Sequence, residues 1–391
     1  MVNGDSFTEK TTQGWLSRIK SALVGIIVGP LLVLVAIGLL WWNEGRAIRT
    51  ATALEEGKGQ VITVSADSVN QSNNGKLVYL SGDATTEEIL KDEQIGVEQK
   101  ALMLRRHSEM YQWVEKKESS SSKNMGGSET TETKYTYVKE WADKHIDSND
   151  FRKPQEHTNP EEFNYPSESW VSEEATIGNF QLGEELIQKL GANKKIAIDI
   201  PESEDSEESE AIGAVVGDYY YIGENSEEPA VGDIRISYFI SPVGEVSVVA
   251  AQSDSALIPY VSRNGTSIAL IQSGKHSSDS LFTTAQQENT IITWLIRLGG
   301  AFLTIIGLMM FMQILPVIGD VVPFIGSVIG FGTGLVSLVF GLAISSTTIA
   351  LAWIAYRPVI ACSIIVVAVM MIGFLYRQRK PQEKAAQAAA A

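Results

Sequence analysis

The chain has 391 residues, and its 44% hydrophobic residues gather near the two ends instead of spreading as a soluble core would. Residues 43–290 carry 43 Asp and Glu against 22 Lys and Arg, so the middle of the chain is strongly acidic. Such a segment repels a phosphate backbone, which excludes nucleic acid as a first candidate partner. Cys362 is the single cysteine, which excludes an intrachain disulfide, a CxxC pair and a multi-cysteine zinc site.

The first apolar run covers residues 22–42 and holds 21 uncharged residues, about the length that crosses a hydrocarbon core. A cleaved signal peptide is the alternative. The run is longer than the usual apolar region of such a peptide, and it ends in Trp41-Trp42 without a small-residue cleavage site. The pattern therefore predicts a retained transmembrane helix behind a short segment at 1–21.

Three further uncharged runs follow near the C-terminus: residues 298–319, 321–356 and 358–376. The middle run has 36 residues, too many for one helix of ordinary tilt. We divide it into an interfacial or re-entrant piece near 321–331 and a span over 332–355. Residues 291–376 are thus expected to form three transmembrane helices, which gives four in total.

Basic residues flank the outermost spans: Arg377, Arg379, Lys380 and Lys384 after the last, and Lys10, Arg18 and Lys20 before the first. Four spans place both termini on one side, and the positive-inside rule assigns that side to the cytosol. The tail at 377–391 is basic, Ala-rich and expected to be cytosolic. Arg46 and Arg49 weaken the N-terminal signal, so the orientation depends mainly on the C-terminal cluster. The acidic domain is expected to face away from the cytosol.

The acidic domain, 43–290, contains short apolar runs that alternate and end at turn residues, which is typical of strands. They cover residues 61–69, 76–80, 102–114, 135–141, 196–200, 218–222, 234–240 and 246–250. One helix is expected at 183–190, and exposed loops at 119–133 and 202–210. The fold class is an integral membrane α + β protein, with one N-terminal and three C-terminal transmembrane helices around a large β-rich extracytosolic domain.

Several longer motifs occur in order: NEGRAIRTATALEEG from residue 43, KLVYLSG, LRRHSEMYQWVE from 104, YTYVKEW, HTNP, VGDIRISY and AWIAYRP. In these motifs the chain resembles the LUMA family, also called the transmembrane protein 43 family, over most of its length. The resemblance implies a membrane protein of the endoplasmic reticulum and inner nuclear membrane in animals, regarded as an organiser of membrane protein complexes. It implies no enzymatic activity. In a bacterium, the plasma membrane would be the corresponding location.

One predicted strand carries the most informative set of side chains: Arg105, His107, Glu109, Tyr111 and Trp113. Side chains alternate along a strand, so these residues share one face, together with Met103. Arg, Tyr and Trp dominate interface energetics, which indicates a surface for partners or self-association. A ladder of cross-strand pairs within one sheet is the competing interpretation, and we favour it. A catalytic His107 is disfavoured because no nucleophile motif accompanies it.

Glycines in the apolar runs are spaced four residues apart: Gly25 and Gly29 in the first, and Gly326, Gly330 and Gly334 near the third. This spacing lets helices approach closely in lipid, although glycine is also simply common in membrane helices. Arg297 and Asp320 are expected to extend toward the membrane interface from the two ends of the second span.

The sequence lacks the motifs of metal, phosphate or hydrolase sites, since HExxH, GxxxxGK[ST], GxSxG and GxGxxG are all absent. We expect no enzymatic activity, cofactor or metal. The leading hypothesis is a non-enzymatic scaffold that organises membrane protein complexes, with the lipid bilayer, further copies of the chain and other membrane proteins as partners. The alternative is a pore or transporter subunit.

Overall fold

The computed structural model describes residues 5–199, 213–358 and 370. The acidic loop expected at 202–210, Cys362 and nearly all of the fourth expected span lie outside these residues. The described chain forms two compact units, each built from separate stretches. The β unit takes its residues from 1–12, 52–122 and 130–287, and the helical unit from 13–51, 123–129 and 288–391.

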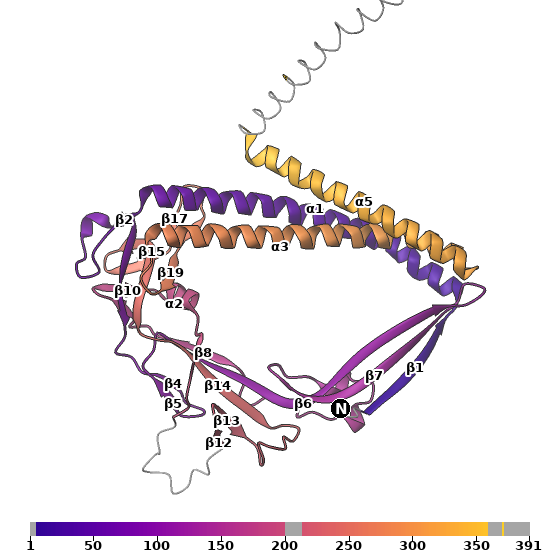
Figure 1. Cartoon of the computed structure of the whole chain (residues 1–391), viewed down its shortest axis with the longest axis horizontal. Helices are drawn as coiled ribbons and strands as arrows, with labels where there is room; N and C mark the ends of the chain where they lie inside the picture. The colour runs from indigo at the N-terminus through magenta and orange to yellow at the C-terminus, as the bar shows by residue number, and fades with distance from the viewer. Residues whose placement is uncertain (1–4, 200–212, 359–369, 371–391) are drawn as a thin grey trace, which may run out of the picture. The chain divides into compact units, whose positions relative to one another are not determined.

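The larger sheet of the β unit has eight strands, two of them very long (Figure 1). Its spatial order is β1 (Asp5–Gln13), β7 (Glu129–Ala142), β6 (Met103–Lys123), β14 (Ile234–Ser241), β13 (Tyr219–Ile222) and β12 (Ala214–Val216). Two more strands join it, β11 (Lys194–Ile196) on β14 and β8 (Glu168–Val171) on β6. β6 and β7 are joined by a short turn, while β6 pairs antiparallel with β14 on its other side.

The second sheet has seven strands: β19 (Leu270–Ser273), β15 (Gly244–Ser253), β16 (Ala256–Ile258), β10 (Phe180–Leu182), β9 (Thr176–Ile177), β3 (Leu77–Thr85) and β2 (Ile62–Thr63). An additional β15–β3 pairing closes the middle strands into a ring. Leu80, Phe180 and Val248 fill it and are fully buried. Helix α2 (Glu184–Leu190) adds buried Leu186 to this core.

Smaller elements complete the β unit. They are the strand pairs β4 (Leu90–Asp92) with β5 (Val97–Gln99) and β17 (Tyr260–Val261) with β18 (Ser267–Ile268), and the 3-10 turns Gln71–Asn73, Ser148–Asp150 and Pro154–Glu156. The expected helix at 183–190 is confirmed as α2, which Gly183 precedes and Gly191 ends at a positive φ of 65°. Most predicted strands are confirmed, but 61–69 forms a strand only at Ile62–Thr63, and the strand predicted at 196–200 overlaps β11 only at Ile196 among the described residues.

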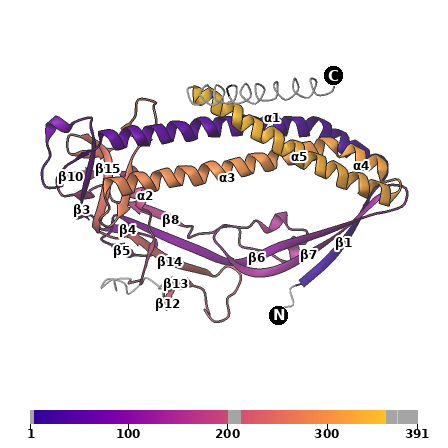
Figure 2. The ribbon, with the colours of Figure 1, turned by 45° about the horizontal axis from the view of Figure 1, so that its top comes forward.

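The long helices are α1 (Trp15–Gln60), α3 (Ser278–Met312) and α5 (Pro323–Tyr356), with the short α4 (Ile314–Gly319) between the last two. α1 and α3 lie side by side in both views (Figures 1 and 2). α3 ends at Met312 because Pro316 has no N–H to donate to the Met312 carbonyl. Pro323 begins α5. Its missing N–H has no effect there, because the first N–H groups of a helix have no partner within the helix.

Three stretches of the described residues are long and apolar enough to cross a membrane: Trp15–Gln60, Ser278–Gly319 and Pro323–Tyr356. α1 continues well beyond the predicted span at 22–42. Its last turns belong to the β unit, where Ala53 and Leu54 are buried against residues of β3 and α3 such as Leu77 and Phe282. The expected boundary at residue 43 therefore lies inside a helix.

Two expectations from the sequence are wrong. The loop expected at 119–133 is the end of the β6–β7 hairpin, in which only 124–128 are outside the strands. Its Ser and Thr residues pair across the strands, with 3.1 Å between the hydroxyl oxygens of Ser119 and Thr133. The break expected near residue 331 is also absent, since α5 is continuous and the turn at 320–322 precedes it. A re-entrant position for 321–331 remains a prediction.

Candidate functional site

The face predicted from the sequence, Arg105, His107, Glu109, Tyr111 and Trp113, lies on β6 and is partly exposed. We call these residues the β6 stripe. The intervening side chains, from Leu104 to Gln112, are buried on the opposite face. The alternation expected for this strand is therefore present over its first ten residues.

Neighbouring strands supply a partner for each member of the β6 stripe. The Arg105 guanidinium lies 4.9 Å from the ring centre of Phe239 on β14, and His107 meets the same ring edge-on. Glu109 accepts a 2.6 Å ion-paired hydrogen bond from Nε of Arg235. These contacts connect the stripe to β14 by cation–π and charge interactions.

The band of aromatic rings continues onto β7. Arg235 lies 4.6 Å from the ring centre of Trp141, and Trp141 is 5.2 Å from Tyr111. Trp113 meets His157 edge-on at 4.7 Å. Asn159 fixes the backbone of Trp113 by accepting from its N–H and donating to its carbonyl. The stripe is thus a partly exposed surface whose rings are held in position.

The buried face of β6 contains a charged group that the sequence analysis missed. Arg106 is completely buried and donates to Asp92 at 2.7 Å and to Glu168 at 3.2 Å. Tyr238 donates to the same Asp92 carboxylate at 2.6 Å. Burial, and then this hydrogen bond, raises the pKa of Tyr238 above its usual value. The signal was available, because adjacent arginines in a strand point to opposite faces.

The predicted glycines of α1 lie at its contact with α3. A Cβ on Gly25 would lie 2.4 Å from the Met310 carbonyl oxygen, and one on Gly29 would lie 2.4 Å from that of Gly307. No side chain fits there, so the two backbones approach closely.

The glycines of α5 have different surroundings. A Cβ on Gly326 would lie 1.7 Å from Oδ1 of Asp320. A Cβ on Gly330 would reach the Cβ of Pro316 at 3.6 Å, an ordinary contact, and one on Gly334 would meet nothing within 4 Å. The close approaches therefore involve Gly25, Gly29 and Gly326 but not Gly330 and Gly334.

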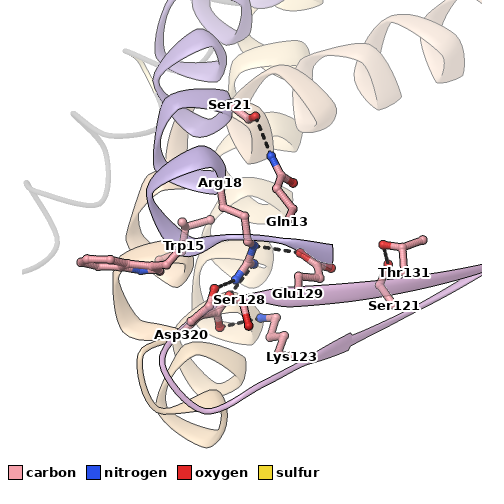
Figure 3. A network of polar contacts seen from close by, with 12 residues as sticks. Gln13, Trp15, Arg18, Ser21, Ser121, Lys123, Ser128, Glu129, Thr131 and Asp320 are labelled. Carbon is pink, nitrogen blue, oxygen red and sulfur yellow. Dashed lines mark hydrogen bonds and ion pairs between the residues drawn. The ribbon is translucent and has the colours of Figure 1, made fainter. Parts of the chain in front are cut away.

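A cluster of four charged side chains lies at one end of the helical unit, and we call it the tip cluster (Figure 3). Its members are Arg18 of α1, Lys123 and Glu129 of the hairpin end, and Asp320 before α5. Asp320 is fully buried and accepts from Arg18 Nη2 at 2.6 Å and from Lys123 Nζ at 2.8 Å. Arg18 Nε is also 2.9 Å from Glu129. The buried carboxylate thus has two cationic partners.

Backbone contacts complete the tip cluster. Arg18 donates to the Gly127 carbonyl at 2.7 Å, and the Gly126 N–H donates to the Val321 carbonyl at 3.0 Å. Gly127 has a φ of 82°, and a Cβ there would lie 2.3 Å from the Trp15 ring. Glycine is therefore required by both the turn and the ring.

A second buried ion pair lies within the helical unit. Arg297 of α3 donates to both oxygens of Glu44 on α1, at 2.7 and 2.8 Å, and the Trp353 indole of α5 donates to Glu44 at 3.0 Å. The positions of Arg297 and Asp320 at the two ends of an apolar run predict that both extend toward the membrane interface. In the structure both instead form ion pairs with partners distant in the sequence, which no local pattern identifies.

Nothing in the described ranges resembles a metal centre, since no three His, Cys, Asp or Glu side chains gather there in a group that could hold an ion. The described residues thus contain a set of long apolar helices, three groups of ion pairs, each built on a buried carboxylate, and an aromatic, charged strand face.

Comparison with known proteins decides the family. The model of the family described as transmembrane protein 43 matches residues 110–358. The chain belongs to the transmembrane protein 43 family. It is 34% identical to the mouse (Mus musculus) transmembrane protein 43 over 96% of this chain and 95% of that protein. The resemblance drawn from the motifs is confirmed.

Other members of the transmembrane protein 43 family align over similar lengths. The human (Homo sapiens) protein is 32% identical over 95% of this chain and 94% of its own length. The Drosophila melanogaster homolog is 32% identical over 86% of this chain and 90% of its own length. No solved structure matches. Together with the long apolar helices, this membership identifies an integral membrane protein.

Proposed function

We propose that the chain is a non-enzymatic membrane scaffold that organises membrane protein complexes, and that its β unit docks a second copy or another membrane protein. The β unit is proposed to lie outside the cytosol, because the C-terminal basic cluster favours the cytosol. In a eukaryotic cell the membrane would be that of the endoplasmic reticulum and inner nuclear envelope, and in a bacterium the plasma membrane.

The observation that carries the proposal is the β6 stripe. It presents Arg, Tyr and Trp side chains in one partly exposed band, and these residue types contribute most to protein interfaces. Contacts with Phe239, Arg235 and Trp141 already order the rings, so a partner would lose little side-chain entropy by binding them.

Tyr111→Ala tests the proposal in the full chain, solubilised in nanodiscs. Loss of an interface aromatic costs about 2 kcal/mol or more, which is roughly a 30-fold weaker association. The particle mass measured by light scattering should fall, while circular dichroism and the melting temperature stay unchanged. Trp113→Ala should act in the same direction.

Tyr260→Ala is the matched control, because Tyr260 is a partly exposed aromatic on a different sheet. It should leave the particle mass unchanged. Two results would contradict the proposal. Unfolding of Tyr111→Ala would make the stripe an internal ladder of the sheet, and unchanged mass with unchanged melting would make it ordinary surface.

A further inference from the structure

One edge of the short strand β8 is open. On its other side β8 pairs with β6, in a register that sets Val171 opposite Met103. The Ser172 N–H donates to the Leu102 carbonyl at 2.9 Å, so every second residue of β8, counted from Ser172, directs its main-chain groups toward β6. The main-chain groups of Ser169 and Val171 therefore point away from β6. In the part of the chain that the structure describes, no backbone or side-chain group bonds to them.

A hollow of about 480 Å³ lies against this open edge. Met103, Ser169 and Val171 of the larger sheet line one side of it, and Glu184 and Gln188 of α2 line another. α2 lies next to β8 in the fold (Figures 1 and 2). Directly opposed residues of paired strands share a face, so the hollow opens on the same face of the sheet as the β6 stripe. It is thus a groove between a strand edge and a helix.

The lining of the hollow combines negative charge with an apolar surface. Glu173 and Glu184 line it and are exposed, and Glu184 accepts a 2.7 Å hydrogen bond from the neutral amide of Gln188. No Lys, Arg or His among the described residues lines the hollow. Val171 and the buried Leu182 supply apolar surface beside the carboxylates. A complementary ligand therefore carries a cationic group next to an apolar one.

The open strand edge favours a peptide as this ligand. Ser169 and Val171 offer two N–H and two C=O groups, which an extended backbone satisfies by adding a strand to β8. Alternate side chains of that backbone then face the hollow. Val171 and Glu173 are two residues apart, about 7 Å along a strand, so successive inward side chains of the peptide reach one and then the other.

We infer that this hollow binds an extended segment of a partner protein in which a Lys or Arg lies two positions from an apolar residue. The main-chain bonds to β8 supply affinity, and the two carboxylates select the cation. The acidic stretch at 202–210 of this chain or of a second copy does not fit, because its charge has the same sign as that of the hollow.

The inference does not depend on the function proposed for Tyr111 and Trp113. Tyr111 is eight residues along β6 from Met103, roughly 26 Å, so the two surfaces do not overlap. Tyr111→Ala should therefore leave peptide binding in the hollow unchanged, whatever its effect on particle mass. Failure of one proposal is thus distinguishable from failure of the other.

The first test measures peptide binding to the full chain in nanodiscs by fluorescence anisotropy. The probe is a labelled TKTVTKT peptide, in which a Lys lies two positions from the Val in either strand direction. It should bind about tenfold or more tightly than TETVTET, because like charges oppose binding. Methylation of the three central backbone nitrogens removes the donors to β8 and should weaken binding by about tenfold or more.

The second test compares two neighbouring carboxylates. Glu173→Gln should weaken TKTVTKT binding by about threefold or more, whereas Glu174→Gln is the matched control, because Glu174 is equally exposed but does not line the hollow. Val171→Pro removes an outward N–H without removing a bond to β6, and it should abolish binding while the melting temperature shows that the chain is folded.

Four results would each overturn the inference. They are equal affinities for the Lys and Glu peptides, undiminished binding of the methylated peptide, equal effects of Glu173→Gln and Glu174→Gln, and no binding of TKTVTKT up to about 1 mM. The first and third would remove the role of the carboxylates, and the second would remove strand addition. The fourth would leave the hollow without a peptide ligand.

Discussion

Two adjacent arginines of β6 have opposite surroundings: Arg105 lies in the partly exposed β6 stripe, and Arg106 is completely buried. The alternation of β6 was predicted, and so was the identity of the stripe, because a period of two follows from strand geometry alone. The buried ion pairs of Arg106 were not predicted, because its partners Asp92 and Glu168 lie on other strands, β4 and β8. A local sequence pattern cannot identify partners that only the fold brings together.

Arg106→Met should strongly destabilise the β unit. The change leaves the fully buried Asp92 carboxylate without its cationic partner, and breaking such a pair costs about 3 to 5 kcal/mol. Arg105→Met is the matched control on the adjacent, partly exposed position, where the expected cost is below about 1 kcal/mol. Thermal melting of the detergent-solubilised chain, followed by circular dichroism, measures both. Equal melting temperatures for the two variants would contradict the assignment of the faces.

At the scale of elements, apolar runs and breakers located most helices and strands but not their ends. The predicted span at 22–42 is the apolar part of a much longer α1, since residues after it are also good helix formers and pack on the β unit. The Ser, Thr and Gly content of the hairpin end at 119–133 predicts a loop. Those hydroxyls instead pair across the strands, as in Ser121 with Thr131 at 2.8 Å, and β-branched Thr favours strands.

Gly29→Ala and Gly38→Ala should have opposite effects. Both glycines lie in the apolar part of α1, where alanine is the better helix former by about 0.5 to 1 kcal/mol. At Gly38 a methyl group meets nothing within 4 Å, so the variant should be slightly more stable. At Gly29 it meets backbone atoms of α3 at 2.4 and 2.7 Å, and overpacking of this kind costs about 1 to 3 kcal/mol.

The midpoint temperature of heat-induced aggregation in detergent separates the two glycine variants. It should fall for Gly29→Ala and hold or rise for Gly38→Ala. If both variants changed in the same direction, the contact between α1 and α3 would not be the close one described.

At the scale of the whole molecule, three of the four spans expected from the sequence correspond to long apolar helices in the described residues. The composition of the two units could not, because each collects stretches from across the chain. The end of the β6–β7 hairpin, 123–129, belongs to the helical unit. Its ties join Lys123 to Asp320, 197 residues away, and Gly127 and Glu129 to Arg18, which is 109 residues from Gly127. Apolar periodicity contains no information on such pairs.

Asp320→Asn should release the hairpin end from the helical unit. It removes the charge that Arg18 and Lys123 share, and it leaves both cations without that carboxylate. Lys123 is then more accessible, so trypsin should cut after it faster than in the unchanged chain. Glu132→Gln is the control, because its pair with Lys10 is exposed and contributes little. Identical cleavage rates at Lys123 in Asp320→Asn and the control would show that the tip cluster does not hold the hairpin.

The residues of the tip cluster are made at widely separated times during translation. Arg18 and Asp320 are 302 residues apart, and at ribosomal speed this separation corresponds to roughly 15 to 60 s of translation. During that interval the first apolar helix has left the ribosome, while its arginine still lacks the Asp320 carboxylate. The newly made chain therefore completes the tip cluster only after residue 320 has been synthesised, when four-fifths of the protein has already been made.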